Sequence, residues 1–101
     1  MRILVMFDLP VETEKQRRAY RVFRKYLVQN GFMMMQKSIY TKIALNHAAA
    51  YAIIGNVRKN KPEEGLVQVL QVTEKQFANM EYIVGEANST VLDTDERLVI
   101  L

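Results

Sequence analysis

The sequence MRILVMFD, at residues 1–8, decides the fold of this chain of 101 residues. The run from Ile3 to Phe7 is apolar without a break, and it stops at the carboxylate of Asp8. A short continuous apolar run of this kind is typical of a strand that is buried on both faces. Because an ionised carboxylate is rarely found at the lip of such a strand without a partner, Asp8 is the first candidate for chemistry in the chain.

A helix is expected after this strand, from about residue 13 to residue 29. Thr13 and Gln16 have the spacing of a capping box, and Asn30-Gly31 is a typical helix end. At about 100° per residue, apolar side chains fall on one face and cations on the opposite face. The apolar face holds Ala19, Val22, Phe23, Tyr26 and Leu27, and the cations are Lys15, Arg17, Arg18, Arg21, Arg24 and Lys25. Glu14 is placed to pair with Arg18 only, so we expect the cationic face to stay largely unneutralised.

The rest of the chain alternates between strand and helix signals. Residues 32–44 predict either one long strand or two short strands joined by a bend, with a bulge near residues 36–38. The further predicted elements are a helix at about 46–60 capped by Asn46, a strand at 66–72, a short helix opened by the capping box Thr73–Gln76, and strands at 80–84 and 97–101.

This order predicts an α+β protein with the ferredoxin-like βαββαβ fold, in one domain that spans residues 1–101. Both helices of such a fold cover one face of an antiparallel sheet. Since the first strand is apolar on its other face as well, we expect two sheets to pack face to face in a homodimer. Strands within residues 80–101 are surplus to a four-stranded sheet, and we expect them to pair with the partner subunit or a bound protein.

Composition narrows the classes of function. There is no cysteine, hence no disulfide framework, and no signal peptide or membrane-length apolar run is present, which predicts a cytoplasmic protein. The net charge is +3, and residues 15–25 hold six of the fourteen Lys and Arg residues. Clustered cations are the footprint of a protein that binds nucleic-acid phosphates, although a solvated helix face gives the same pattern.

Catalytic motifs are scarce, which leaves Asp8 as the candidate. The chain has no glycine-rich phosphate loop, no HExxH motif and no recognisable Ser-His-Asp set, and His47 is interpreted as a surface residue. One carboxylate is a poor Mg²⁺ site, but two copies of Asp8 across a two-fold axis supply two carboxylates. A Mg²⁺ ion held there could bind a phosphodiester and activate water. The structural alternative is that Asp8 caps the turn through Leu9-Pro10.

Several short segments, in this order and spacing, resemble a known family. They are Phe7-Asp8 at the end of the first strand, the Arg-rich first helix, Gln36-Lys37-Ser38-Ile39-Tyr40, and Thr73–Phe77 followed by Tyr82–Gly85. Together they resemble the small CRISPR-associated endoribonuclease-type proteins that partner the CRISPR integrase in spacer acquisition. The Phe-Asp-Leu-Pro start and residues 96–101 are most similar to the branch from type II systems.

The resemblance implies a ferredoxin-like homodimer with Asp8 of each subunit at a shared Mg²⁺ site, in the cytoplasm of a prokaryote. It implies a scaffold that bridges two integrase dimers and holds duplex DNA, and also the RNase or DNase activity ascribed to the family. Whether the chain is an enzyme stays open at this point, and a free-standing metal-dependent endoribonuclease is the alternative. A third reading, a regulatory domain that binds a small ligand between protomers, lacks a suitable polar or glycine-rich loop.

Overall fold

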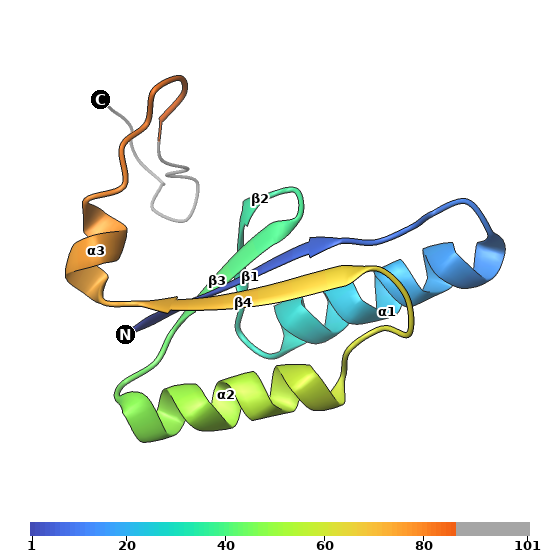
Figure 1. The fold of residues 1–101 in the computed structure, drawn as a ribbon, viewed down its shortest axis with the longest axis horizontal. Coiled ribbons are helices and arrows are strands. Elements are labelled where there is room, and N and C mark those ends of the chain that lie inside the picture. The colour runs from blue at the N-terminus through green and yellow to red at the C-terminus, as the bar shows by residue number, and fades with distance from the viewer. Residues whose placement is uncertain (87–101) are drawn as a thin grey trace.

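The fold is a four-stranded antiparallel sheet with the strand order β2-β3-β1-β4, seen in a computed structural model that describes residues 1–86. The two long helices, α1 and α2, lie on one side of the sheet (Figure 1). The strands are β1 (Arg2–Asp8), β2 (Met33–Gln36), β3 (Ile39–Ile43) and β4 (Leu66–Val72), and the helices are α1 (Glu14–Gln29), α2 (His47–Lys59) and α3 (Glu74–Ala78). This arrangement confirms the predicted ferredoxin-like α+β fold. None of the described helices is long and apolar enough to cross a membrane.

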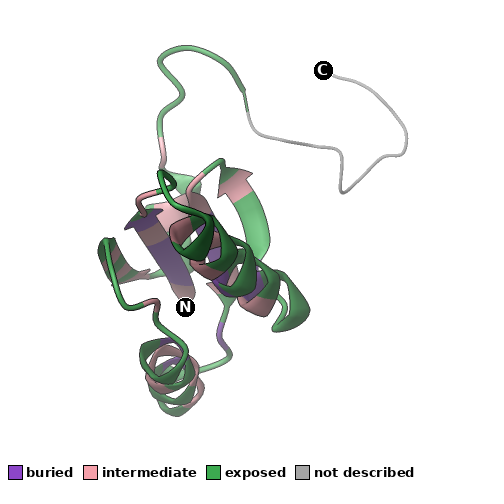
Figure 2. Cartoon of the chain, turned by 90° about the vertical axis from the view of Figure 1, so that its right-hand side faces the viewer, coloured by how far each residue is buried: buried purple, intermediate pink, exposed green. Residues whose placement is uncertain are grey.

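The central strand β1 pairs along its length with β3 on one side and with β4 on the other. The odd-numbered residues of β1 point toward the helices. Figure 2 shows the buried part of the sheet next to the helices. Phe7 packs edge-on against Phe23 of α1, with ring centroids 5.3 Å apart, and stacks on Tyr40 of β3 at 5.7 Å. The side chains that close this core are Ile3, Val5, Phe7, Phe23, Leu27, Phe32, Tyr40, Ala44, Ala50 and Val57.

The predicted start of α1 is confirmed atom by atom. The backbone N–H of Gln16 donates to Thr13 Oγ1 at 3.1 Å, and Gln16 Oε1 accepts from the Thr13 N–H at 3.0 Å. The predicted apolar face is wrong at one position, because Val22 is 59% exposed. Tyr20 packs against the core in its place, 6.0 Å from Phe7. Phe23 lies at the centre of the buried face. Tyr20, three positions before it, is about 60° away around the helix, whereas Val22, its immediate neighbour, is about 100° away.

The region from residue 32 to residue 44 forms two short strands, which decides between the two predicted arrangements. Lys37 and Ser38 make the turn between β2 and β3. The register shifts between Met34 and Gln36, beside the predicted bulge. The shift adds one residue to β2, so that Met33 and Gln36 pair with Thr41 and Ile39, which lie on the same face of β3.

The second half of the fold follows the predicted caps. Asn46 Oδ1 accepts from the Ala49 N–H at 2.8 Å and starts α2, and Thr73 with Gln76 forms the second capping box, which starts α3. The C-cap residue of α2, Asn60, donates from its side chain to the Asn56 carbonyl at 2.8 Å. Burial raises the pKa of Tyr26 on α1, and the nearby Asn60 side chain partly offsets the increase.

A charged clamp from Arg2 holds α3 on the end of the sheet. Its guanidinium donates to both carboxylate oxygens of Glu74 at 2.9 Å, and it lies 4.1 Å from the centroid of the Phe77 ring. The hydrogen bonds from Arg2 lower the pKa of Glu74. Because the folded-state pKa is depressed, the clamp stabilises the fold above the ordinary carboxyl pKa, and this contribution is lost as the pH falls through the lowered value.

The strand predicted at residues 80–84 is absent from the described chain, which forms irregular structure and a bend there. A strand needs a neighbouring ladder for its backbone N–H and C=O groups. Residues 80–86 instead line a cavity with Met33–Gln36 of β2, where they pair with none of the described strands. The strand predicted at 97–101 lies outside the described residues.

Gly65 gives a test of how tightly the loop before β4 packs on the end of β1. Its φ is +100°, and a Cβ there would lie 2.7 Å from Leu9 Cδ2 and 2.9 Å from the Asp8 carbonyl oxygen. We therefore expect Gly65→Ala to lower the free energy of unfolding by about 2–3 kcal/mol, measured by urea denaturation. Gly85→Ala is the matched control, because Gly85 has a φ of +87° and open space around it. The control should lose only about 1 kcal/mol, and equal losses would show that the clash contributes nothing.

Candidate nucleic-acid interface and acidic site

Asp8 is the last residue of β1, where it pairs with Leu66 of β4. Because side chains alternate along a strand, Asp8 lies on the sheet face opposite to the one that carries Phe7 and the helices. It is exposed, and within residues 1–86 its carboxylate accepts no hydrogen bond from the following turn. The alternative that Asp8 caps this turn is therefore not supported, and the carboxylate is available to a ligand.

A shallow cavity of about 390 Å³ lies beside Asp8. The polar side chains that share it come from the end of β2, the β2–β3 turn and β4, and they are Gln36, Lys37, Ser38 and Gln68. Sequence reasoning did not pick out Gln68 as part of this site. A signal was present, because the alternation of β4 places Gln68 between Leu66 and Leu70 on an otherwise apolar face.

The fit of this site to Mg²⁺ depends on a second carboxylate. No group of three or more acidic, His or Cys side chains is gathered anywhere in residues 1–86. Mg²⁺ is usually held by one or two carboxylates together with waters and phosphate oxygens. One chain supplies Asp8 and the neutral oxygen donors of Gln36, Ser38 and Gln68, with the cation of Lys37 beside them. The oxygen donors fit the ion, and the number of carboxylates calls for a second chain.

The sheet face that carries Asp8 is largely apolar and only partly covered: Leu4 and Thr41 at its centre are buried, while side chains around them are exposed. Four of its side chains are between 46% and 56% exposed, and they are Met33, Ile43, Leu66 and Leu70. The pairing of Leu4 with Thr41 and Leu70 places the centre of this face on β1. Exposed apolar side chains on one sheet face of a small protein indicate an interaction surface. We call it the open face.

The outward face of α1 carries the predicted cations, but their pairing differs from the prediction. Glu14 pairs with Arg17 at 3.3 Å and with Arg21 at 3.2 Å, and it does not pair with Arg18. Arg17 also donates to the carbonyl oxygens of Val11 and Glu12, at 3.1 and 3.0 Å. These bonds fold Arg17 back over the first turn of the helix and bring its guanidinium beside Glu14.

The remaining cations of α1 are less constrained. Lys15 faces Glu63 across 3.8 Å, and both side chains are 84% exposed, so this pair is weak. Arg18, Arg24 and Lys25 are exposed and form no ion pair with any residue in the described part of the chain. The helix therefore presents exposed cations from its second turn toward its C-terminal end, with Arg18 and Lys25 on one side and Arg24 about 120° around the helix from Arg18.

Comparison with known proteins places this geometry in a family. The family model described as CRISPR associated protein Cas2 matches residues 1–80. The chain belongs to the Cas2 family. It is 56% identical to a CRISPR-associated endoribonuclease Cas2 from Treponema denticola over the full length of both chains. It is 46% identical to a protein of the same name from Streptococcus mutans, over the whole of this chain and 93% of that one.

A solved Cas2 structure supports the fold. The crystal structure of Streptococcus pyogenes Cas2 at pH 6.5 matches with a TM-score of 0.61 and 20% sequence identity, covering 83% of this chain and 100% of that one. The resemblance drawn from the sequence motifs is thus confirmed at the level of the Cas2 family.

Proposed function

We propose that this Cas2-family chain forms a homodimeric scaffold in CRISPR spacer acquisition, which bridges integrase dimers and binds the duplex part of the captured DNA. The observation that carries the proposal is the set of exposed cations on α1, which are Arg18, Arg24 and Lys25. Arginine can contact one phosphate through two parallel N–H donors, and such contacts to the backbone are independent of base sequence. A protein that must accept any captured sequence needs this kind of contact.

The same helix favours a duplex over a single strand. Proteins that hold single strands usually offer exposed aromatic rings on which bases stack. On α1 the aromatic rings of Tyr20, Phe23 and Tyr26 all turn toward the core. The outward face therefore offers charge without stacking platforms, which suits the regular phosphates of a duplex.

The open face supports the proposed dimer. Burying a half-exposed leucine or isoleucine on each of two sheets stabilises an association in proportion to the apolar area removed from water. A two-fold axis through this face would bring like residues of the two chains together wherever they lie near the axis. In our proposal two such dimer-facing sheets leave both α1 helices outside, where they are accessible to DNA.

A second candidate function, Mg²⁺-dependent cleavage of RNA or duplex DNA, rests on Asp8. In this proposal Asp8 from each subunit would hold the ion, which supplies a Lewis acid and lowers the pKa of a bound water. Asp8 would orient that water by accepting a hydrogen bond, while Gln68 and Ser38 of the adjoining cavity could position the phosphodiester. The names of the relatives from T. denticola and S. mutans are consistent with ribonuclease activity in those proteins.

The proposed role also implies a location in the cell. Acquisition of CRISPR spacers takes place in the prokaryotic cytoplasm, and we propose that location for this chain. We further propose that it belongs to the type II branch, on the basis of the Phe7-Asp8-Leu9-Pro10 start.

Removing two α1 cations should weaken duplex binding and make the binding less dependent on salt concentration. We expect Arg18→Ala/Arg24→Ala to lower the slope of log Kd against log salt by about 1.8, because each lost phosphate contact removes about 0.9. The measurement is fluorescence anisotropy with a short duplex that has single-stranded ends. Arg58→Ala/Lys59→Ala removes the same charge from the end of α2 and is the matched control. Equal slopes for the two variants would contradict a specific role of α1.

A charge in the middle of the open face should prevent dimer formation. Leu70→Lys places an ammonium group at the centre of the proposed interface, and we expect sedimentation analysis to show the mass of a monomer. Leu45→Lys is the control, because Leu45 is 92% exposed and lies outside the sheet. A dimer that persists in Leu70→Lys would place the interface elsewhere.

Cleavage, where it occurs, should require Asp8 and a divalent cation. We expect Asp8→Asn to reduce the rate of RNA or DNA cleavage at least about 100-fold, as does chelation of the metal, while duplex affinity stays unchanged. Equal cleavage by the wild-type protein and the variant would assign the activity to a contaminant or to another site.

A further inference from the structure

Methionine thioethers are the only sulfur groups of this chain, which has six methionines and no cysteine. Two of them are well exposed, Met33 at 46% and Met34 at 49%. The other four, at positions 1, 6, 35 and 80, are less exposed. An oxidant that reacts with sulfur therefore meets Met33 and Met34 first, because a covered thioether is shielded from solvent.

These two neighbours on β2 lie on opposite faces of the sheet. Met33 pairs with Thr41 and lies with it on the open face. Met34 pairs with Tyr40, whose side chain is buried on the side of the helices. Because side chains alternate along a strand, an oxygen atom added to Met33 changes the open face, and one added to Met34 does not.

The thioether of Met33 suits an apolar interface, and its oxidation product does not. A methionine side chain is flexible and apolar, so it packs well against an apolar surface such as the one that Leu70 and Ile43 offer on the open face. Oxidation converts this side chain into a polar sulfoxide, a change that disrupts interfaces rich in methionine. Covering the new S=O group with apolar side chains costs free energy, because water no longer solvates its oxygen.

We propose that Met33 is an oxidation site that controls the homodimer: a peroxide converts its thioether to the sulfoxide in the free subunit, and the oxidised subunit does not dimerise through the open face. This inference rests on the proposed homodimer and adds its regulation. A lone pair of the Met33 sulfur attacks one peroxide oxygen, an S–O bond forms as the O–O bond breaks, and the other oxygen leaves as water. The sulfur is oxidised and the peroxide reduced, and a thiol-dependent sulfoxide reductase reverses the change.

Dimer formation and oxidation compete for the same side chain. The second copy covers Met33 in the proposed dimer, whereas Met34 on the other face stays accessible. The subunit is therefore vulnerable at Met33 only while it is free. Once oxidised, it is kept out of the dimer until the sulfoxide is reduced.

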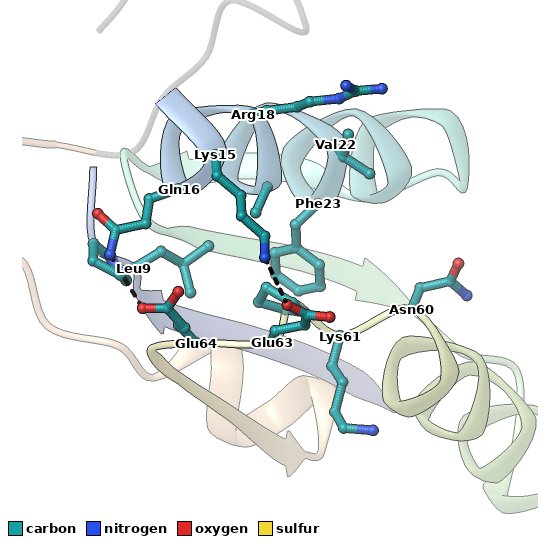
Figure 3. Close-up of a pocket in the computed structure, with 13 residues that line it drawn as sticks. Leu9, Lys15, Gln16, Arg18, Val22, Phe23, Asn60, Lys61, Glu63 and Glu64 are labelled. Carbon is teal, nitrogen blue, oxygen red and sulfur yellow. Dashed lines mark hydrogen bonds and ion pairs between the residues drawn. The ribbon is translucent and has the colours of Figure 1, made fainter. Parts of the chain in front are cut away.

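The helix side of the molecule carries no such target. Neither α1, α2 nor the loop that joins α2 to β4 contains a methionine. Figure 3 shows the groove between α1 and this loop, where Gln16 Nε2 donates to Glu64 Oε1 at 3.1 Å and no methionine is among the lining residues. Oxidation of methionine therefore leaves the cations of α1 chemically unchanged, and it acts on the proposed scaffold through the dimer.

The test compares Met33→Leu with Met34→Leu, since leucine is an apolar side chain of similar volume that peroxide does not oxidise. Each full-length protein is treated with hydrogen peroxide, its oxidised residues are identified by peptide mass spectrometry, and its mass is measured by sedimentation. We expect oxidation to raise the Kd of the dimer at least about tenfold in the wild-type protein and in Met34→Leu, and to leave it within about twofold in Met33→Leu. Treatment with the reductase should restore the original Kd.

The rate of oxidation tests the competition with the dimer. Leu70→Lys supplies the free subunit for comparison, because its charge is expected to prevent dimer formation. At a concentration where about one wild-type subunit in ten is free, we expect Met33 to be oxidised about tenfold more slowly in the wild-type protein than in Leu70→Lys. Met34 is the internal control, and its rate should be the same in both proteins.

The outcomes separate this proposal from the one on which it rests. A dimer that persists with Met33 fully oxidised would overturn the oxidation site and leave the homodimer standing, as would equal rates of Met33 oxidation in the wild-type dimer and in Leu70→Lys. Loss of the dimer on oxidation of Met33→Leu would assign the effect to another methionine, against the proposal. A wild-type protein that sediments as a monomer before any oxidation would overturn the homodimer itself.

Discussion

The packing of Phe7 on Phe23 and Tyr40 is the interaction on which the other features of the molecule depend. These three rings join β1, α1 and β3 at the carboxyl end of the central strand. Aromatic pairs in such geometry contribute about 0.5–1.5 kcal/mol each beyond the area that they bury. With Phe7 fixed in the core, the alternation of the strand fixes Asp8 on the opposite face, and Phe23 fixes which side of α1 looks outward.

The loop before β4 connects the end of β1 to the start of α1. Gly65 lets the loop approach the Asp8 carbonyl, and the next residue back, Glu64, receives the Gln16 amide. Gln16 also closes the capping box, so the start of α1 is tied to the loop and, through it, to the end of β1. The end of β1 with Asp8 and the first turn of α1 are consequently connected through this loop.

Local signals made most of this fold predictable. Capping residues, helix stops and the apolar strand at 66–72 act over a few residues, and the bounds drawn from them agree with the structure closely. The errors arose mainly where distant contacts decide. Tyr20 packs on the core and Val22 does not, because the core packs against the Tyr20 side of α1. The partners of Glu14 were missed for a local reason, since Arg17 folds back onto the Val11 and Glu12 carbonyls five and six residues away. The strand predicted at 80–84 is absent because these residues pair with none of the described strands. The sequence of a segment alone does not show whether a neighbouring strand is available to it.

The separation of the two charged sites explains why binding and cleavage should be distinct functions. Asp8 lies on the open face of the sheet, whereas α1 lies on the other side (Figure 1). A phosphodiester held on the outward face of α1 is therefore separated from Asp8 of the same chain by the helix and the sheet, about 10 Å or more of packed protein. In the proposed scaffold, DNA held by the arginines would thereby be kept away from the Asp8 carboxylate of its own subunit. A scaffold that must preserve the DNA it holds benefits from that separation, and the same geometry would require any substrate of Asp8 to approach by a different face.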